Sequence, residues 1–283
     1  MTKLQAHINN VALPHAIFSL PFAFMGALMA TDGKVSAWTL FLIALAVTTA
    51  RSAALAINNL VDLKYDKLQP RMSYRAMVRG EISKTEAIIF IICCLILLVA
   101  TVAQLPPICL KLLPVAALPF IIYPFTKRFT GFCHLILGIA LAMAPAGAWL
   151  ASGGKIFAPP MILLSVAIMF WIAGFDAIYG AQDEKFDKRQ KLHSLATEFG
   201  VRKAFRIVKI WHLISILSLI VLGIILKLGA IYFLGVGIAA GTLIYQHAIV
   251  SPKDFSQVTQ KYFLRNGIVS IALLLFTWLD YLF

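Results

Sequence analysis

The chain has 283 residues, of which 61% are hydrophobic and only 13% are charged. Soluble domains carry roughly 25% charged residues, so this composition excludes an ordinary soluble domain and indicates a membrane protein. The formal net charge is +13. Because the basic residues stand in short stretches between apolar segments, this charge indicates membrane orientation and contact with lipid head groups or anionic substrates, and no nucleic-acid partner.

Nine apolar segments follow one another along the chain, each close to the roughly 20 residues that a helix needs to cross a bilayer. No linker or change of composition divides them, so we expect one integral-membrane domain over residues 1–283. The predicted fold is an all-α bundle of about nine transmembrane helices around a central cavity. The segments cover approximately residues 11–30, 36–60, 86–103, 106–123, 132–151, 157–179, 205–227, 228–248 and 263–283.

The distribution of Lys and Arg between these segments predicts the orientation of the bundle. Most of the 25 basic residues fall at the N-terminus and in the connections that follow the even-numbered segments. Cytoplasmic loops of membrane proteins are enriched in Lys and Arg, so this face and the N-terminus are predicted to be cytoplasmic. The two long connections, residues 61–84 and 181–203, lie on the same face, and we expect the cavity to open there. The opposite connections carry only Lys34, Lys111, Lys155 and Lys227.

Paired aspartates follow the second and the sixth apolar segments. Asp62 and Asp66 are four residues apart, and the same spacing returns in Asp183 and Asp187. Residues four apart share one face of a helix, so each pair projects two carboxylates in one direction. A single pair would be a solvated helix end, but two pairs on one membrane face favour a shared catalytic cation site. Hard oxygen ligands with no His or Cys in the pattern point to Mg²⁺ rather than zinc.

Basic residues surround both acidic pairs. Mg²⁺ is usually held by a few carboxylates together with phosphate oxygens of a substrate. Lys and Arg side chains beside such a site can bind the remaining phosphate oxygens, although contact with lipid head groups explains basic residues there equally simply. Lys127 and Arg128 stand out because their connection is otherwise short. The predicted diphosphate-binding residues are Lys64, Arg71, Lys127, Arg128 and Lys185.

Taken together, these motifs resemble the UbiA superfamily of membrane-embedded prenyltransferases over nearly the whole chain. The resemblance departs from the family pattern at Asn59, where many members have Asp, and at Ala76, where Pro is usual. Neither departure affects the two aspartate pairs. The matching elements are Asn58, Asp62 and Asp66 (N-x-x-x-D-x-x-x-D); Pro70, Arg71 and Arg75 in the basic loop; Tyr123, Pro124, Lys127 and Arg128 (YPxxKR); and Asp176, Tyr179, Asp183 and Asp187 (D-x-x-Y-x-x-x-D-x-x-x-D).

The resemblance implies transfer of a polyprenyl chain from a polyprenyl diphosphate to a small aromatic acid, with Mg²⁺ as cofactor. Asn58 joins the four aspartates as a predicted metal ligand on this basis. The stretch 174–183 is most similar to the quinone-pathway branch that acts on 4-hydroxybenzoate. Two alternatives stay open: the same chemistry on 1,4-dihydroxy-6-naphthoate for menaquinone and, more distantly, a secondary transporter with many spans and intramembrane charges.

Two charges lie deeper in the predicted spans. Arg51 precedes Asn58 by seven residues and Asp176 precedes Asp183 by seven, close to two helical turns, so each lies on its motif's face about 10 Å farther into the membrane. One hypothesis places them at the aromatic-acceptor end of the pocket, with Arg51 facing a ring carboxylate. The other is a structural Arg51–Asp176 ion pair. The predicted acceptor-binding residues are Arg51, Arg75, Asp176 and Tyr179.

Overall fold

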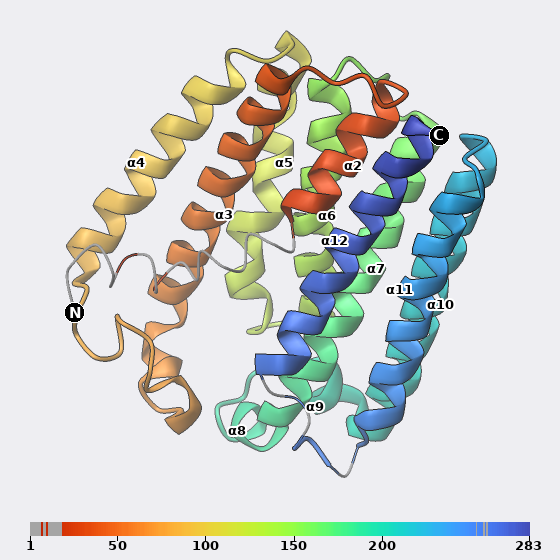
Figure 1. Cartoon of the computed structure of the whole chain (residues 1–283). Coiled ribbons are helices and arrows are strands. Elements are labelled where there is room, and N and C mark those ends of the chain that lie inside the picture. The colour runs from red at the N-terminus through yellow and green to blue at the C-terminus, as the bar shows by residue number, and fades with distance from the viewer. Residues whose placement is uncertain (1–6, 8–9, 11–18, 253, 257, 259) are drawn as a thin grey trace.

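The computed structural model describes residues 7, 10, 19–252, 254–256, 258 and 260–283, and these form a bundle of long helices (Figure 1). The long helices are connected by short 3₁₀ turns and loops, among them the turns Pro70–Met72 and Ala181–Asp183. The helices are α2 (Leu20–Ala30), α3 (Ala37–Asp66), α4 (Lys84–Val102), α5 (Pro107–Thr126), α6 (Cys133–Ala151), α7 (Pro159–Gly180), α8 (Glu184–Arg189), α9 (Leu195–Phe199), α10 (Val201–Ile225), α11 (Ala230–Ile249) and α12 (Gln260–Leu282).

The predicted all-α membrane bundle is confirmed. Within the described residues, seven helical stretches are long and apolar enough to cross a membrane, and two shorter apolar helices, Leu20–Ala30 and Asn266–Leu282, accompany them. These positions are compatible with the nine predicted segments, although residues 11–18 of the first segment lie outside the described residues. The N-terminal residues 1–6, on which part of the orientation argument rests, also lie outside them.

Helix α7 lies at the centre of the bundle, packed against α6 on one side and α10 on the other. Small residues allow this close approach, as is usual where apolar helices pack in a membrane. A Cβ atom on Gly138 of α6 would lie 2.3 Å from the carbonyl oxygen of Met169 in α7. Trp171 of α7 is almost fully buried, and its indole N–H donates to the side-chain oxygen of Asn266 in α12, 3.1 Å away. The aspartates that follow α7 therefore start from a firmly held helix.

The close contact at Gly138 gives a test of this packing. We expect Gly138→Ala to destabilise the protein by about 1–3 kcal/mol, because the added methyl group must displace backbone of α7. The apparent melting temperature in detergent measures the effect. Gly147→Ala is the matched control on the same helix, since a Cβ atom there meets nothing within 4 Å. Equal melting temperatures for the two variants would contradict the close α6–α7 contact.

Three connections that carry site residues gather at one end of the bundle (Figure 1). The loop between α3 and α4 has a small core of its own, in which Met77 and Ile82 are buried against Leu63 of α3. A capping box formed by Ser83 and Glu86 then starts α4. The connection after α8 is fixed by the buried Leu195. Both long loops are therefore ordered by apolar contacts rather than by charge alone.

Candidate active site

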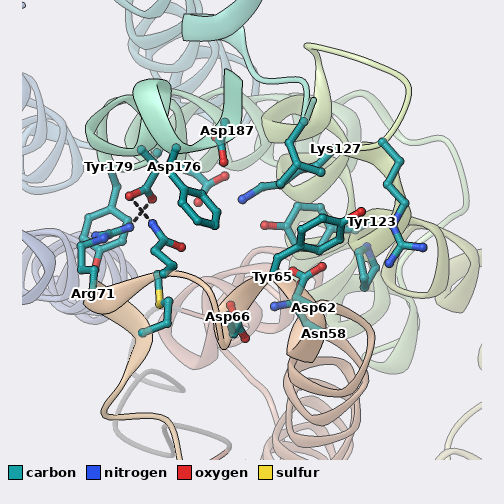
Figure 2. Close-up of a pocket in the computed structure, with 18 of the residues that line it drawn as sticks. Asn58, Asp62, Tyr65, Asp66, Arg71, Tyr123, Lys127, Asp176, Tyr179 and Asp187 are labelled. Carbon is teal, nitrogen blue, oxygen red and sulfur yellow. Dashed lines mark hydrogen bonds and ion pairs between the residues drawn. The ribbon is translucent and has the colours of Figure 1, made fainter. Parts of the chain in front are cut away.

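A cavity of about 140 Å³ lies at this end of the bundle and brings both acidic motifs together (Figure 2). Helix α3 contributes the first motif to its wall, and α7 with the following turn and α8 contributes the second. Its lining residues are Asn58, Asp62, Tyr65, Asp66, Gln69, Arg71, Met72, Arg75, Tyr123, Pro124, Lys127, Arg128, His134, Asp176, Tyr179, Gly180, Asp183, Phe186, Asp187 and Leu192.

The first motif occupies the end of α3, which continues to Asp66, six residues beyond the end of the predicted segment. Asn58, Asp62 and Asp66 therefore share one face of a continuous helix, as their spacing predicts. The Asp66 carboxylate accepts a hydrogen bond from the Arg75 guanidinium. Asp62 makes no hydrogen bond or ion pair with any described residue, and its carboxylate faces the cavity.

The second motif is less regular than the first. Helix α7 ends at Gly180, a 3₁₀ turn covers Ala181–Asp183, and α8 then carries Asp187. Asp183 accepts a hydrogen bond from the Gln69 amide at 2.6 Å and pairs with the Arg71 guanidinium. Asp187 is buried and forms no side-chain hydrogen bond or ion pair with the described part of the chain. In each motif, one carboxylate is held by an arginine and the other is unpaired.

The two aspartate pairs face each other without closing on a single point. Among the described residues, no three acidic, His or Cys side chains lie close enough together to be the ligands of one metal ion. Arg71 and Arg75, both from the loop between α3 and α4, pair with Asp183 and Asp66, one carboxylate of each motif. The shared cation site that the two aspartate pairs predict therefore stays a prediction. The individual metal-ligand roles stay predictions.

Lys127 is the unpaired cation of the cavity. It directly follows α5, and its side chain points between Asp187 and Tyr123 (Figure 2). Burial acts to lower the pKa of the Lys127 ammonium, but the neighbouring acidic groups, which are Tyr123 and Cys133 when ionised together with Asp176 and Asp187, outweigh burial and raise this pKa. The ammonium is therefore charged at neutral pH. It makes no hydrogen bond or ion pair with a described residue, which leaves it available to an anion in the cavity.

Arg128 lines the same cavity but is partly engaged. Its guanidinium donates to the carbonyl oxygen of Val61, 3.3 Å away. The same group lies 5.1 Å from the centre of the Phe125 ring and 5.8 Å from that of Tyr65. These contacts connect the end of α5 to the end of α3. Arg128 therefore both holds the wall of the cavity and contributes to its positive charge.

The inner end of the cavity is formed by Asp176, Tyr179 and a histidine. Asp176 accepts a hydrogen bond from the His134 imidazole, with Nδ1 and Oδ2 2.7 Å apart. The Arg71 guanidinium lies over the Tyr179 ring, 4.9 Å from its centre. Asp176 and Tyr179 thus stand where the sequence places them, on the cavity face of α7. The predicted alternative of an Arg51–Asp176 ion pair is wrong, because His134 is the partner of Asp176.

Three predicted site residues lie outside the cavity. The side chains of Lys64 and Lys185 are exposed and do not line it. Lys64 lies two residues from both aspartates of α3, and Lys185 lies two residues from Asp187 in α8, which is about 200° around a helix and places each lysine on the opposite face. Arg51 also does not line the cavity, and its guanidinium donates to the Ser19 hydroxyl at 2.7 Å. Diphosphate binding by Lys64 and Lys185, and acceptor binding by Arg51, have no support from this geometry.

The contact of Arg51 gives a specific expectation. In Arg51→Leu, loss of the hydrogen bond to Ser19 should lower the apparent melting temperature. The KM values for both substrates should stay unchanged, because the guanidinium does not reach the cavity. Steady-state kinetics on the purified variant measures both constants. A KM that rises for the aromatic substrate alone would restore the predicted acceptor role of Arg51.

Sequence reasoning missed Gln69 and His134, and it named Tyr123 only as part of the YPxxKR element, without a role in the site. Tyr123 lies four residues before Lys127, so helical spacing could have placed it on the cavity face. Gln69 binds Asp183 across 114 positions of sequence, and this pairing depends on how the loop folds. His134 stands at the start of α6, outside both acidic motifs. No signal in the sequence connects it to Asp176.

The fold and the cavity define the class of the protein: a multi-pass integral membrane protein whose acidic and basic residues form one site at the end of a helical bundle. Residues 19–268 match the UbiA prenyltransferase family, and the chain belongs to that family. It is thus an enzyme of the prenyltransferase class, as the resemblance implies. The membership of this family accounts for the many spans and the charges near the membrane, which were the grounds for the alternative hypothesis of a secondary transporter.

Similar proteins of known name or structure agree with this assignment. The chain is 29% identical over 274 residues to the 4-hydroxybenzoate octaprenyltransferase of Methylobacillus flagellatus. The aligned region covers 96% of this chain and 92% of the relative. The apo structure of a UbiA homologue from Aeropyrum pernix K1 is 30% identical, with a TM-score of 0.82 over 92% of this chain and 96% of the other. A UbiA homologue from Archaeoglobus fulgidus, solved bound to DMAPP and Mg²⁺, shares the fold at 19% identity. Its TM-score is 0.74 over 97% of this chain and 98% of the other.

Proposed function

We propose that the protein transfers a polyprenyl group from a polyprenyl diphosphate to an aromatic acid of the 4-hydroxybenzoate type, with release of diphosphate, in quinone biosynthesis. One observation carries the proposal: the unpaired Asp62 and Asp187 carboxylates share a cavity with the unpaired Lys127 ammonium. The name of the Methylobacillus relative supports the acceptor class. The Archaeoglobus homologue bound to DMAPP and Mg²⁺ supports the donor class.

The chemistry of the donor groups fits Mg²⁺. Asp62 and Asp187 offer free carboxylate oxygens, and Asn58, which lines the same cavity one helical turn before Asp62, carries an amide oxygen. Mg²⁺ prefers oxygen ligands and completes its coordination with water and substrate phosphates, so two open carboxylates suit it better than a closed protein cage. We assign Asp62 and Asp187, together with Asn58, to holding Mg²⁺ with the diphosphate, and keep Asp66 and Asp183, which Arg75 and Arg71 hold in this structure, as proposed further ligands. When bound, the ion would supply positive charge to the leaving diphosphate.

The basic residues of the cavity would stabilise the leaving group. When the allylic carbon–oxygen bond breaks, its electron pair goes to the diphosphate oxygen. Lys127, Arg71 and Arg128 line the cavity in which this charge would develop. Charged donors that are already in place when charge develops usually provide the largest share of catalysis. This role keeps three of the five diphosphate-binding residues that the sequence predicts.

The allylic cation needs protection from water. Tyr65, Tyr123 and Phe186 line the cavity, and aromatic ring faces attract cations. The apolar helices around the site exclude solvent from the reacting carbon. The aromatic ring of the acceptor then attacks the cation, forms the new carbon–carbon bond and loses a proton. We place this acceptor at the inner end of the cavity, beside Asp176 and Tyr179 and with Arg75 nearby.

Direct turnover tests the proposal. Purified protein in lipid nanodiscs is supplied with Mg²⁺, a polyprenyl diphosphate and one acceptor at a time, and the product is identified by mass spectrometry. We expect prenylated 4-hydroxybenzoate and diphosphate release, with loss of turnover on chelation of Mg²⁺. Product with 1,4-dihydroxy-6-naphthoate alone would assign the menaquinone alternative. If no aromatic acid yields product, the proposed function fails.

The orientation of the site is part of the same proposal. The cavity is expected to face the cytoplasm, because the connections that carry it hold most of the Lys and Arg residues. Cysteine substitutions at the exposed Lys203 and at Lys155, on the opposite face, can be labelled in intact cells with an impermeant maleimide. Labelling of the Lys155 variant alone is the expected result. Labelling of the Lys203 variant alone would reverse the orientation.

A further inference from the structure

We infer that Asp176 accepts the ring proton of the aromatic acceptor and that His134 is the positioning residue that holds Asp176 for this task. The inference rests on the proposed function and adds to it the final step of the reaction. It is carried by the geometry of the hydrogen-bonded pair at the inner end of the cavity, with Nδ1 of His134 2.7 Å from Oδ2 of Asp176.

Asp176 is the carboxylate best placed to act as a base. Asp66 and Asp183 are neutralised by Arg75 and Arg71, and Asp62 and Asp187 are assigned to the cation and diphosphate. Asp176 precedes Asp183 by about two helical turns, which separates it by roughly 10 Å along α7 from the diphosphate end. Its only hydrogen-bond partner among the described residues is His134. Unlike Asp66 and Asp183, Asp176 has no arginine partner among the described residues, so no guanidinium covers its carboxylate oxygens.

The two oxygens of Asp176 have different surroundings. Oδ2 accepts the hydrogen bond from His134, whereas Oδ1 makes no hydrogen bond with a described residue. The Asp176 side chain is 22% exposed and lines the cavity, but that of His134 is only 2% exposed. The pair therefore presents one free carboxylate oxygen to a bound acceptor and keeps its imidazole behind it. This arrangement suits a base that is oriented from the protein side.

The position of His134 is tightly defined by the helices around it. A Cβ atom on Gly180 of α7 would lie 3.0 Å from Cε1 of the imidazole, so only glycine leaves room for the ring without adjustment. The ring thus packs against the backbone of the helix that carries Asp176. The Lys127 ammonium is also attracted to Asp176. By holding Oδ2, His134 prevents the carboxylate from turning fully toward this cation.

The proton transfer balances without any further reactant. The ring carbon that has gained the prenyl group still carries its hydrogen, and the ring bears a positive charge. The C–H bond breaks, its electron pair restores the aromatic ring, and the proton moves to Oδ1 of Asp176. His134 keeps its hydrogen bond to Oδ2 throughout. Departure of the product returns the proton to solvent and regenerates the carboxylate.

Ring-deuterated acceptor tests this assignment in the full-length enzyme. The variants are His134→Leu, which removes the hydrogen bond, His134→Gln, whose amide can still donate to Asp176, and Asp176→Asn, which cannot accept the proton. The control is His247→Gln, since His247 binds His212 between α10 and α11, outside the cavity. The measurements are kcat, the KM for each substrate and the isotope ratio, which is kcat with the ordinary acceptor divided by kcat with the ring-deuterated acceptor.

We expect His134→Leu and Asp176→Asn to lower kcat by roughly 10²–10⁴-fold, the usual contribution of a positioned base. The isotope ratio should rise above that of the wild type, because loss of the ring proton becomes the slow step. The KM for the polyprenyl diphosphate should stay unchanged, and His134→Gln should recover a large part of kcat. His247→Gln should behave as the wild type in all of these measurements.

Two results would overturn the inference. If Asp176→Asn keeps the wild-type kcat and isotope ratio, another group, such as the departing diphosphate, takes the proton. If both His134 variants lose activity with no change in the isotope ratio, His134 has a structural role only. Protection of each variant against thermal unfolding by a prenyl diphosphate shows that it is folded. The proposed function fails separately, if the wild type itself prenylates no aromatic acid.

Discussion

Replacement of Lys127 by Met should remove most of the activity. Its ammonium is the unpaired cation that faces the two free carboxylates of the cavity, and its pKa is raised by the surrounding negative groups. Loss of one preorganised donor to a developing anion costs about 10²–10³-fold in kcat. We expect Lys127→Met to reach at least this loss, with an increased KM for the polyprenyl diphosphate. Single-turnover and steady-state assays on purified protein measure both effects.

The matched control for this variant is Lys203→Met. Lys203 is an exposed lysine near the start of α10 and does not line the cavity, so its replacement is expected to leave kcat unchanged.

Removal of a partly buried positive charge at Lys127 should also make the ligand-free protein less stable, because Asp176 and Asp187 lose a favourable neighbour. A Lys127→Met enzyme with wild-type kcat and KM would exclude the lysine from diphosphate binding.

Asp62→Asn should abolish the response to Mg²⁺. A bound metal ion contributes several kcal/mol to the transition state, and each 1.36 kcal/mol is tenfold, so the expected loss in kcat is on the order of 10³-fold. Asp62 forms no ion pair with a described residue, and its removal therefore leaves no arginine without a partner. We expect the variant to fold, and calorimetry in detergent should show that Mg²⁺ with a prenyl diphosphate no longer raises its melting temperature.

Asp254→Asn is the control for Asp62→Asn. Asp254 lies at the same end of the bundle, is exposed and does not line the cavity. Its effect on turnover and on Mg²⁺-dependent stabilisation should be small. Asp183→Ala should lose activity as well, but it also leaves Arg71 without its ion pair, and its melting temperature should fall. Full Mg²⁺-dependent turnover by Asp62→Asn would remove Asp62 from the metal site.

Local spacing predicted the parts of the site that lie on regular helices. Asn58, Asp62 and Asp66 could be assigned to one face because α3 continues without interruption through all three. Lys64 lies about 200° from both aspartates, so the same helical spacing excludes it from their face. The helical type of the spans was likewise predictable from apolar length, and the nine predicted segments are compatible with the seven long and two shorter apolar helices among the described residues.

The pairing of charges was not predictable, because it depends on folding of the loop between α3 and α4. Arg71 and Arg75 belong to a single basic stretch, yet one binds Asp183 and the other binds Asp66. Their directions are set by the buried contacts of Met77 and Ile82 beneath the loop. His134 was missed for a related reason, since only the packing of α6 against α7 brings it to Asp176.

The backbone contact between Lys127 and His193 joins two segments that the ribosome makes at different times. The backbone N–H of His193 donates to the carbonyl oxygen of Lys127 at 2.6 Å, and Gly131 packs against Glu198. The cations Arg71, Arg75, Lys127 and Arg128 are all synthesised before the second acidic motif. Arg71 and the Lys127 turn are therefore made before their partners Asp183 and His193 exist. A nascent chain that stops after α6 would form a half-bundle with an incomplete pocket, in which Arg75 already pairs with Asp66 but Arg71 and Lys127 stay open to anionic lipids until α7 and α8 are made.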